Sequence, residues 1–256
     1  MTVKPPILFL HGAFAGPEVW TRFVAPWFAA RGHTVLVPRL GTPFLPGSRL
    51  RDYVRRARDA ADSLGTPPVV VGHSLGGLVA QHLAAQRPVA GVVLVGSPGP
   101  CGLAPSLWQL SSRAPGVLAS LLATQAGAGA FLGTEAIRQA LFTEDTPDAW
   151  IRRLAVPFTW ESPLALIDGL TWDLPAWFLA RRQPMLAVLG DRDAFVPITD
   201  LWSIALAYGA DTELIHGGAH GLPLDPHWKS LAWRINAWID ERRIDARAEP
   251  LTVRGA

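Results

Sequence analysis

Short apolar runs alternate with helix-length stretches along most of the chain. A continuous apolar run is typical of a strand that is covered on both faces, and such strands separated by helix-length stretches predict parallel βαβ units. Six runs fit this description: residues 7–11, 34–38, 68–72, 91–96, 185–190 and 211–217. The pattern predicts an α/β fold with a mostly parallel, doubly wound sheet of about six strands.

The alternation stops between residues 100 and 183, where no apolar run of comparable quality occurs. Gly- and Pro-rich turns divide this stretch into segments that are typical of short helices. We therefore expect a core built from residues 1–99 and 184–245, and a helical cap inserted at residues 100–183 after the fourth strand. Residues 246–256 are expected to form a flexible tail.

The stretch "VVVGHSLGGLVAQ", residues 69–81, places Ser74 where a buried strand ends and a helix begins. It fits the pattern Gly-x-Ser-x-Gly, in which the small residues Gly72 and Gly76 let a tight, strained turn expose the serine oxygen. The N-terminus of the following helix favours negative charge beside that oxygen. The alternative interpretation is a serine that caps the helix. The strand before it and the small-residue helix after it favour a nucleophile.

A serine hydroxyl needs a base, and the base needs an orienting carboxylate. Of the seven histidines, His216 and His220 follow the last predicted strand. We favour His220, because its loop can reach inward while His216 still belongs to the strand end. Asp191 and Asp193 compete for the carboxylate, and we favour Asp193 because Asp191 is better placed to make the turn. The resulting chain order is serine, aspartate, histidine.

The negatively charged oxygen of an acyl-transfer intermediate also needs hydrogen-bond donors. We expect one donor to be the backbone N–H of Leu75, at the start of the helix. The other is expected from the loop after the first strand, where Gly12 allows close approach. The N–H of Ala13 is the first choice and that of Phe14 the second. This chemistry requires no metal and no organic cofactor.

These segments together resemble the α/β-hydrolase superfamily. The stretches "HGAFAGPEVW", "VVVGHSLGGLVAQHLA", "LGDRDAFVP" and "GGAHGLP" resemble its oxyanion loop, nucleophile elbow, acid loop and histidine loop, and the resemblance covers residues 5–98 and 184–240. The early first loop is similar to the branch that contains methylesterases and hydroxynitrile lyases. The lyases carry a lysine after the catalytic histidine, where this chain has Gly221. The resemblance implies a serine hydrolase acting through an acyl-enzyme.

The predicted cap is rich in tryptophan, which implies a pocket with apolar walls and a hydrophobic or aromatic ester as substrate. The candidate pocket residues are Trp108, Trp150, Trp160 and Trp177. Alternatively, these side chains form a small core within the cap. The same residues would also suit a thioester, lactone, amide or C–C bond, a cofactor-free lyase or perhydrolase, or a binding protein with an idle triad.

Charge and cysteine content exclude several other classes. The 256 residues include 23 Lys or Arg against 21 Asp or Glu, a net charge of +2, so no nucleic-acid partner is expected. Cys101 is the single cysteine, so there is no intrachain disulfide. No run reaches the roughly 18 apolar residues of a transmembrane helix. We expect a cytoplasmic monomer or homodimer without stable membrane association, whose partner is a small ester-like molecule.

Overall fold

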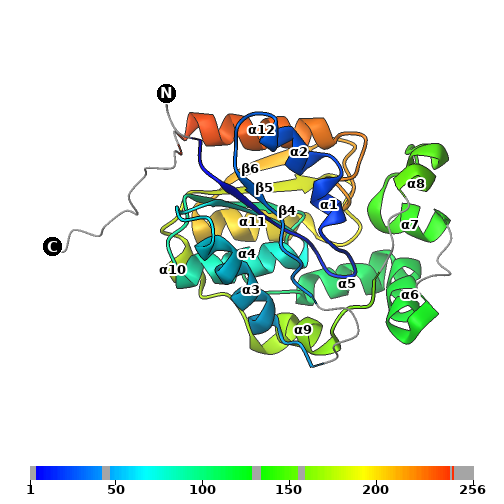
Figure 1. Cartoon of the computed structure of the whole chain (residues 1–256). Coiled ribbons are helices and arrows are strands. Elements are labelled where there is room, and N and C mark those ends of the chain that lie inside the picture. The colour runs from blue at the N-terminus through cyan, green and yellow to red at the C-terminus, as the bar shows by residue number, and fades with distance from the viewer. Residues whose placement is uncertain (1–3, 42–46, 129–133, 155–158, 243, 245–256) are drawn as a thin grey trace.

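A computed structural model of the chain describes residues 4–41, 47–128, 134–154, 159–242 and 244. Six strands form one sheet in the order β2-β1-β3-β4-β5-β6, and every neighbouring pair is parallel (Figure 1). The strands are β1 Ile7–Leu10, β2 Val35–Leu36, β3 Val69–His73, β4 Gly91–Val95, β5 Met185–Gly190 and β6 Asp211–Ile215. The predicted fold class and all six predicted strand positions are confirmed, although β2 is shorter than its apolar run.

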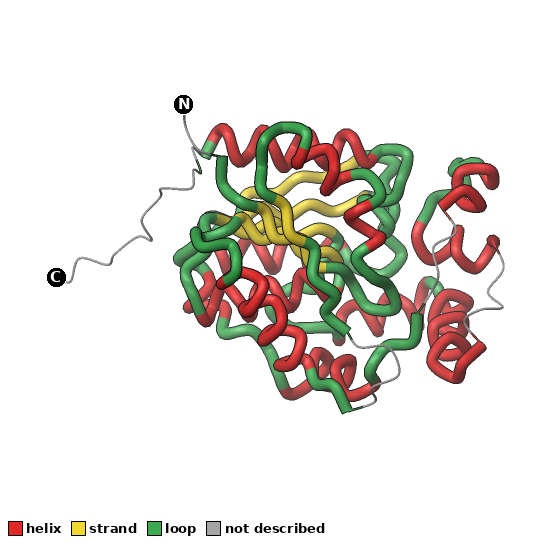
Figure 2. The backbone as a smooth tube through the Cα atoms, viewed as in Figure 1, coloured by secondary structure: helices red, strands yellow, loops and turns green. Residues whose placement is uncertain are grey.

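Helices cover both faces of the sheet, as Figure 2 shows. On one face lie α1 Glu18–Thr21, α2 Val24–Ala29 and α12 Trp228–Glu241; on the other lie α3 Leu50–Asp62, α4 Leu75–Gln86 and α11 Ile198–Tyr208. Alternate strand residues point to opposite faces. In β1, Leu8 packs with the core that includes α3 and α4, while Phe9 packs with the core that includes α1, α2 and α12. Burial on both faces explains why the strand runs are continuously apolar.

Only short helices lie between β4 and β5 in the described ranges. They are α5 Ala104–Arg113, α6 Pro115–Ala123, η1 Thr124–Ala128, α7 Thr134–Leu141, α8 Asp148–Leu154, α9 Pro163–Ile167, η3 Asp168–Trp172 and α10 Trp177–Ala180. We call residues 100–183 the insertion. In Figure 1, α6, α7 and α8 stand beside the sheet. By contrast, α10 packs on α4 and α11, and Ala180 is fully buried in the core on that face.

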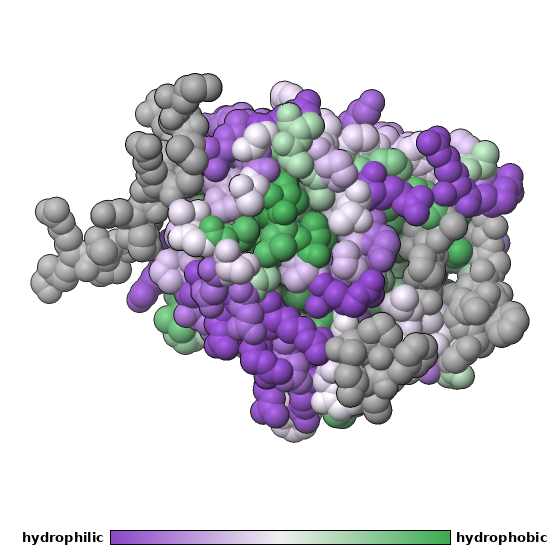
Figure 3. Space-filling model, viewed as in Figure 1, coloured by the Kyte–Doolittle hydropathy of each residue, from purple (hydrophilic) through white to green (hydrophobic). Residues whose placement is uncertain are grey.

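The surface over α3 is hydrophilic, with a smaller hydrophobic area beside it over the sheet edge (Figure 3). Exposed arginines at 51, 55 and 58 lie on one side of this helix, while Tyr53, Val54 and Ala57 face the core. The arginine-rich stretch is therefore the solvated side of an amphipathic helix. Within the described ranges, the structure contains no helix that is both long and apolar enough to cross a bilayer.

Candidate active site

Ser74 lies in a strained turn between β3 and α4. Its backbone angles are φ 54° and ψ −125°, a conformation that costs a non-glycine residue about 1–3 kcal/mol. The turn closes only around small neighbours, because a Cβ on Gly72 would lie 2.3 Å from the Gly76 carbonyl oxygen. A Cβ on Gly76 would lie 2.4 Å from the Leu10 carbonyl oxygen. The Ser74 side chain makes no capping hydrogen bond to α4.

His220 and Asp193 form a buried pair at the carboxyl ends of β5 and β6. The imidazole Nδ1 lies 2.9 Å from Oδ2 of Asp193 and 3.1 Å from Oδ1. Only 4% of the His220 side chain and 1% of the Asp193 side chain are exposed. The backbone N–H groups of Phe195 and Val196 donate to Oδ1 of Asp193 at 2.8 and 2.9 Å. Because a carboxylate only accepts hydrogen bonds, Nδ1 of His220 carries the proton that is shared with Asp193. The other ring nitrogen, Nε2, is then free to act as a base.

The competing pair lies on the surface. Nδ1 of His216 is 3.1 Å from Oδ2 of Asp191, but 87% of the His216 side chain is exposed. Asp191 also accepts a 2.8 Å hydrogen bond from the N–H of Gly217, which closes the turn after β6. The two aspartates therefore take the different positions that the sequence suggested, one in a turn and one buried beside a histidine.

His73 supports the loop that carries His220, a relation that the sequence analysis missed. Its Nε2 lies 2.8 Å from the His220 carbonyl oxygen, and the two rings are 4.8 Å apart. Because a carbonyl only accepts, Nε2 of His73 carries the proton. Burial, with a smaller contribution from the neighbouring His220, lowers the pKa of His73 to about 3. The ring therefore stays neutral and ties the residue before Ser74 to the backbone of His220.

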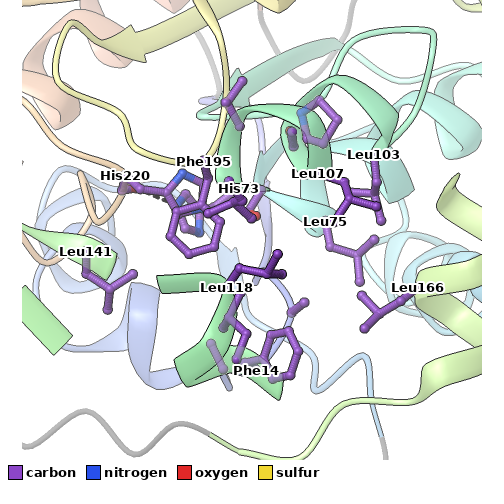
Figure 4. Close-up of a pocket in the computed structure, with 18 of the residues that line it drawn as sticks. Phe14, His73, Leu75, Leu103, Leu107, Leu118, Leu141, Leu166, Phe195 and His220 are labelled. Atoms are coloured by element: carbon purple, nitrogen blue, oxygen red, sulfur yellow. Dashed lines mark hydrogen bonds between the residues drawn. The ribbon is translucent and has the colours of Figure 1, made fainter. Parts of the chain in front are cut away.

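A cavity of about 290 Å³ opens beside Ser74 and His220. In Figure 4, the ring of Phe195 lies against His220, with Phe14 and several leucines around the same space. The leucines contributed by the insertion are Leu103, Leu107, Leu110, Leu118, Leu121, Leu122, Leu141, Leu166 and Leu170. Within the described part of the chain, no Asp, Glu, Lys or Arg lines this cavity. Its walls are therefore mainly apolar, and the polar side chains in the lining are those of His73, Ser74, Ser106, Gln125 and His220.

The expectation that tryptophans line the pocket is wrong for the described residues, because Trp108, Trp150, Trp160 and Trp177 all lie outside the cavity lining. Trp108 is 74% exposed and Trp177 is 41% exposed. Trp150 stacks on Phe23 and donates its indole N–H to the Leu224 carbonyl at 3.0 Å.

The helical phase of α5 explains the outward position of Trp108. Leu103, Leu107 and Leu110 recur at i, i+4 and i+7, and this is the side that faces the cavity. Trp108 follows Leu107 directly and is therefore rotated by about 100° around the helix axis.

The loop after β1 lies against Ser74, since a Cβ on Gly12 would come within 2.9 Å of the Ser74 Cβ. The N–H of Phe14 donates to Oε2 of Glu161 at 3.2 Å. Among the described residues, the N–H groups of Ala13 and Leu75 have no hydrogen-bond partner. These two unpaired donors therefore belong to residues that line the same cavity as Ser74, whereas the N–H of Phe14 is already bonded to Glu161.

Two buried carboxylates near the site carried no signal in the sequence. Glu161 belongs to the insertion and is 5% exposed, and burial raises its pKa. Asp200, in α11, is 3% exposed; burial raises its pKa to about 7, and the charge of Asp193 also contributes. Each is an isolated acid in its local sequence, and only the tertiary fold brings it to the site.

Comparison with known proteins gives a family match over most of the chain. Residues 7–232 match the model of the alpha/beta hydrolase family. The pimeloyl-(acyl-carrier protein) methyl ester esterase of Aromatoleum aromaticum is 38% identical over 105 residues. That match covers 38% of this chain and 39% of the relative, so the chain spans about two fifths of that relative's length.

Solved structures share the fold at low sequence identity. A putative non-heme bromoperoxidase, BpoC, from Mycobacterium tuberculosis is similar with a TM-score of 0.75 and 18% identity, over 94% of each chain. A thermophilic esterase from Thermogutta terrifontis has a TM-score of 0.71 and 19% identity, over 94% of this chain and 91% of that one. At this identity, the likeness establishes the common architecture.

Proposed function

The chain belongs to the α/β hydrolase family, and we propose that it is a serine esterase that cleaves carboxylic esters with an apolar acyl or alkyl part. One observation carries this proposal. Ser74, in a strained strand-to-helix turn, shares an apolar cavity with His220, which is paired with a buried Asp193. A helix cap or a simple core position would need neither the strained turn nor a buried histidine hydrogen-bonded to an aspartate.

In the first half of the proposed reaction, Nε2 of His220 takes the proton of the Ser74 hydroxyl while Oγ attacks the ester carbonyl carbon. The carbonyl oxygen becomes negatively charged and accepts hydrogen bonds from the N–H groups of Ala13 and Leu75. One such donor is worth about 10²–10³ in kcat. The intermediate collapses as His220 protonates the departing alcohol, and the acyl group remains on Ser74.

In the second half, His220 takes a proton from water, and the resulting hydroxide attacks the acyl carbon on Ser74. The same donors hold the second oxyanion. When this intermediate collapses, Oγ leaves with the proton that His220 returns, and the carboxylic acid is released. Asp193 stays ionised throughout and stabilises the imidazolium form of His220.

The cavity supports an uncharged substrate of modest size. Its volume of about 290 Å³ is close to the lower limit for small-molecule sites, which span about 300–1,000 Å³. In this proposal, the insertion at residues 100–183 acts as a cap whose leucines contact the apolar part of the ester. A charged acyl chain would leave an unpaired charge against this wall.

We expect activity on p-nitrophenyl esters to rise with acyl length and then fall. Each buried methylene contributes about 0.8 kcal/mol, so kcat/KM should increase by up to about fourfold per added carbon from acetate until the cavity is filled. Palmitate should be poorer than the optimum, because its chain exceeds the cavity. Initial rates across acetate, butyrate, hexanoate, octanoate and palmitate measure this.

Background rates for every ester in that series would overturn the proposed esterase function. A monotonic fall from acetate would instead contradict the assignment of the leucine-lined cavity as the acyl site. Thioesters and lactones of matched chain length, run in the same series, compare the ester with the other carbonyl substrates that suit this site.

Asp193→Asn is expected to lower kcat/KM by about 10⁴-fold. The amide can donate to Nδ1 of His220, which would place the proton on Nε2 and remove the base. Asp191→Asn is the matched control, because its partner His216 is exposed. It should retain activity within about threefold of wild type, because an exposed charged pair contributes little to the stability of the fold. Equal losses in the two variants would contradict the assignment.

A further inference from the structure

Phe14 has an unusual backbone that the insertion holds in place. It follows Ala13 in the loop beside Ser74, and its φ of 55° is disfavoured for a residue with a large side chain. Both of its backbone polar groups are bonded to the insertion. Its N–H donates to Oε2 of Glu161 at 3.2 Å, and its carbonyl accepts from the N–H of Thr159 at 2.9 Å.

The Glu161 carboxylate is itself fixed from several sides. Its Oε1 accepts hydrogen bonds from the hydroxyl of Tyr53 in α3 and from the N–H of Ser162, the latter at 2.9 Å. The Gln125 amide binds the Glu161 backbone twice, donating to its carbonyl at 2.6 Å and accepting from its N–H at 3.3 Å. With Oε2 on Phe14, both carboxylate oxygens have partners, as a buried carboxylate requires.

The side chain of Phe14 is held by the same part of the protein. It lines the cavity (Figure 4). It also packs against the small cluster that contains Leu110, Val117 and Leu121 of the insertion. The backbone and the side chain are therefore both constrained. The N–H of Ala13 belongs to the preceding peptide, which is joined to the planar Ala13–Phe14 peptide through the φ and ψ angles of Ala13. Holding the Ala13–Phe14 plane therefore leaves only these two angles to turn the N–H of Ala13.

We infer that Glu161 is a positioning residue for the oxyanion loop: through its bond to Phe14, it holds the N–H of Ala13 toward the carbonyl oxygen of an ester on Ser74. This inference rests on the proposed esterase function. An N–H that is preorganised for the developing charge acts on the transition state more than on the bound ester. The loss of Glu161 should therefore appear in kcat rather than in KM.

Glu161→Ala is expected to lower kcat for p-nitrophenyl butyrate by about 100-fold, the scale of a misplacement of about 1 Å in an active site. KM should stay within about threefold, because the leucines of the cavity wall are unchanged. Glu161→Gln keeps one acceptor oxygen for the N–H of Phe14, but one amide cannot accept from all three donors. Its kcat should lie about three- to tenfold below wild type.

Asp168→Asn is the matched control. Asp168 is also a buried carboxylate of the insertion, 2% exposed, and it accepts bonds from the side chain of Arg49 and the N–H of Leu50 at the start of α3. In the described residues it has no hydrogen bond to the loop after β1. This variant should lower the thermal midpoint measured by circular dichroism, while kcat stays within about threefold of wild type.

The outcomes separate the two proposals. Wild-type rates no higher than those of Ser74→Ala would overturn the esterase function, and the inference with it. The inference about Glu161 alone would be overturned if wild-type activity depends on Ser74 but the kcat of folded Glu161→Ala stays within threefold of wild type. An equal kcat loss in Asp168→Asn would overturn it too. If Glu161→Ala does not fold, Glu161→Gln decides: a wild-type kcat overturns the role of Glu161.

Discussion

Ser74→Ala is expected to lower kcat/KM for p-nitrophenyl butyrate by about 10⁵–10⁶-fold. Alanine lacks the oxygen that forms the acyl-enzyme, and the remaining acceleration would come only from binding and from the oxyanion donors. The turn should survive, because alanine has the same Cβ and meets the same contacts as serine at φ 54°. Steady-state kinetics measure this loss. Thermal unfolding checks the fold, and the midpoint should stay within a few degrees of wild type.

This test requires that the Ser74→Ala variant folds, and the glycines around Ser74 leave little space for larger side chains. Gly12, Gly72 and Gly76 each face a neighbour within 3 Å of where a Cβ would lie, so larger changes here would disturb the turn itself. Retention of more than about 1% of the wild-type rate in folded Ser74→Ala would identify another nucleophile, because removing the nucleophile of a serine hydrolase lowers kcat by far more.

His220→Ala should cause a loss of similar size, about 10⁵–10⁶-fold in kcat/KM, because the base and the serine act as one unit. His216→Ala is the matched control: it removes the other histidine after β6, whose side chain is 87% exposed. It should stay within about threefold of wild type. The same ester assay on both variants decides between them, and the reverse pattern would assign the base to His216.

The strands were predictable because their signal is local. Runs such as residues 69–72 and 185–189 are buried on both faces, so each residue had to be apolar regardless of the details of packing. The preference for Asp193 over Asp191 also rested on local chain geometry, and the structure places the first in a buried pair and the second in a turn. Their catalytic roles stay predictions.

The cavity wall and its supports were not predictable in the same way. Whether Leu107 or Trp108 faces the cavity depends on how α5 is rotated against the core, which composition does not specify. The bond between Glu161 and Phe14 joins residues 147 positions apart, as does the bond between His73 and His220. The first contact joins the insertion to the loop after β1, and the second joins β3 to the loop after β6, so both exist only after distant parts of the chain have packed together.

Mass spectrometry of a trapped adduct tests directly whether Ser74 is the nucleophile. The wild-type protein is treated with an alkyl fluorophosphonate, which forms a stable bond to an activated serine, and is then digested. We expect one adduct, on the peptide that carries Ser74, and unmodified Ser74→Ala and His220→Ala proteins under the same conditions. An unmodified wild-type protein, or an adduct elsewhere such as on the exposed Cys101, would contradict this assignment.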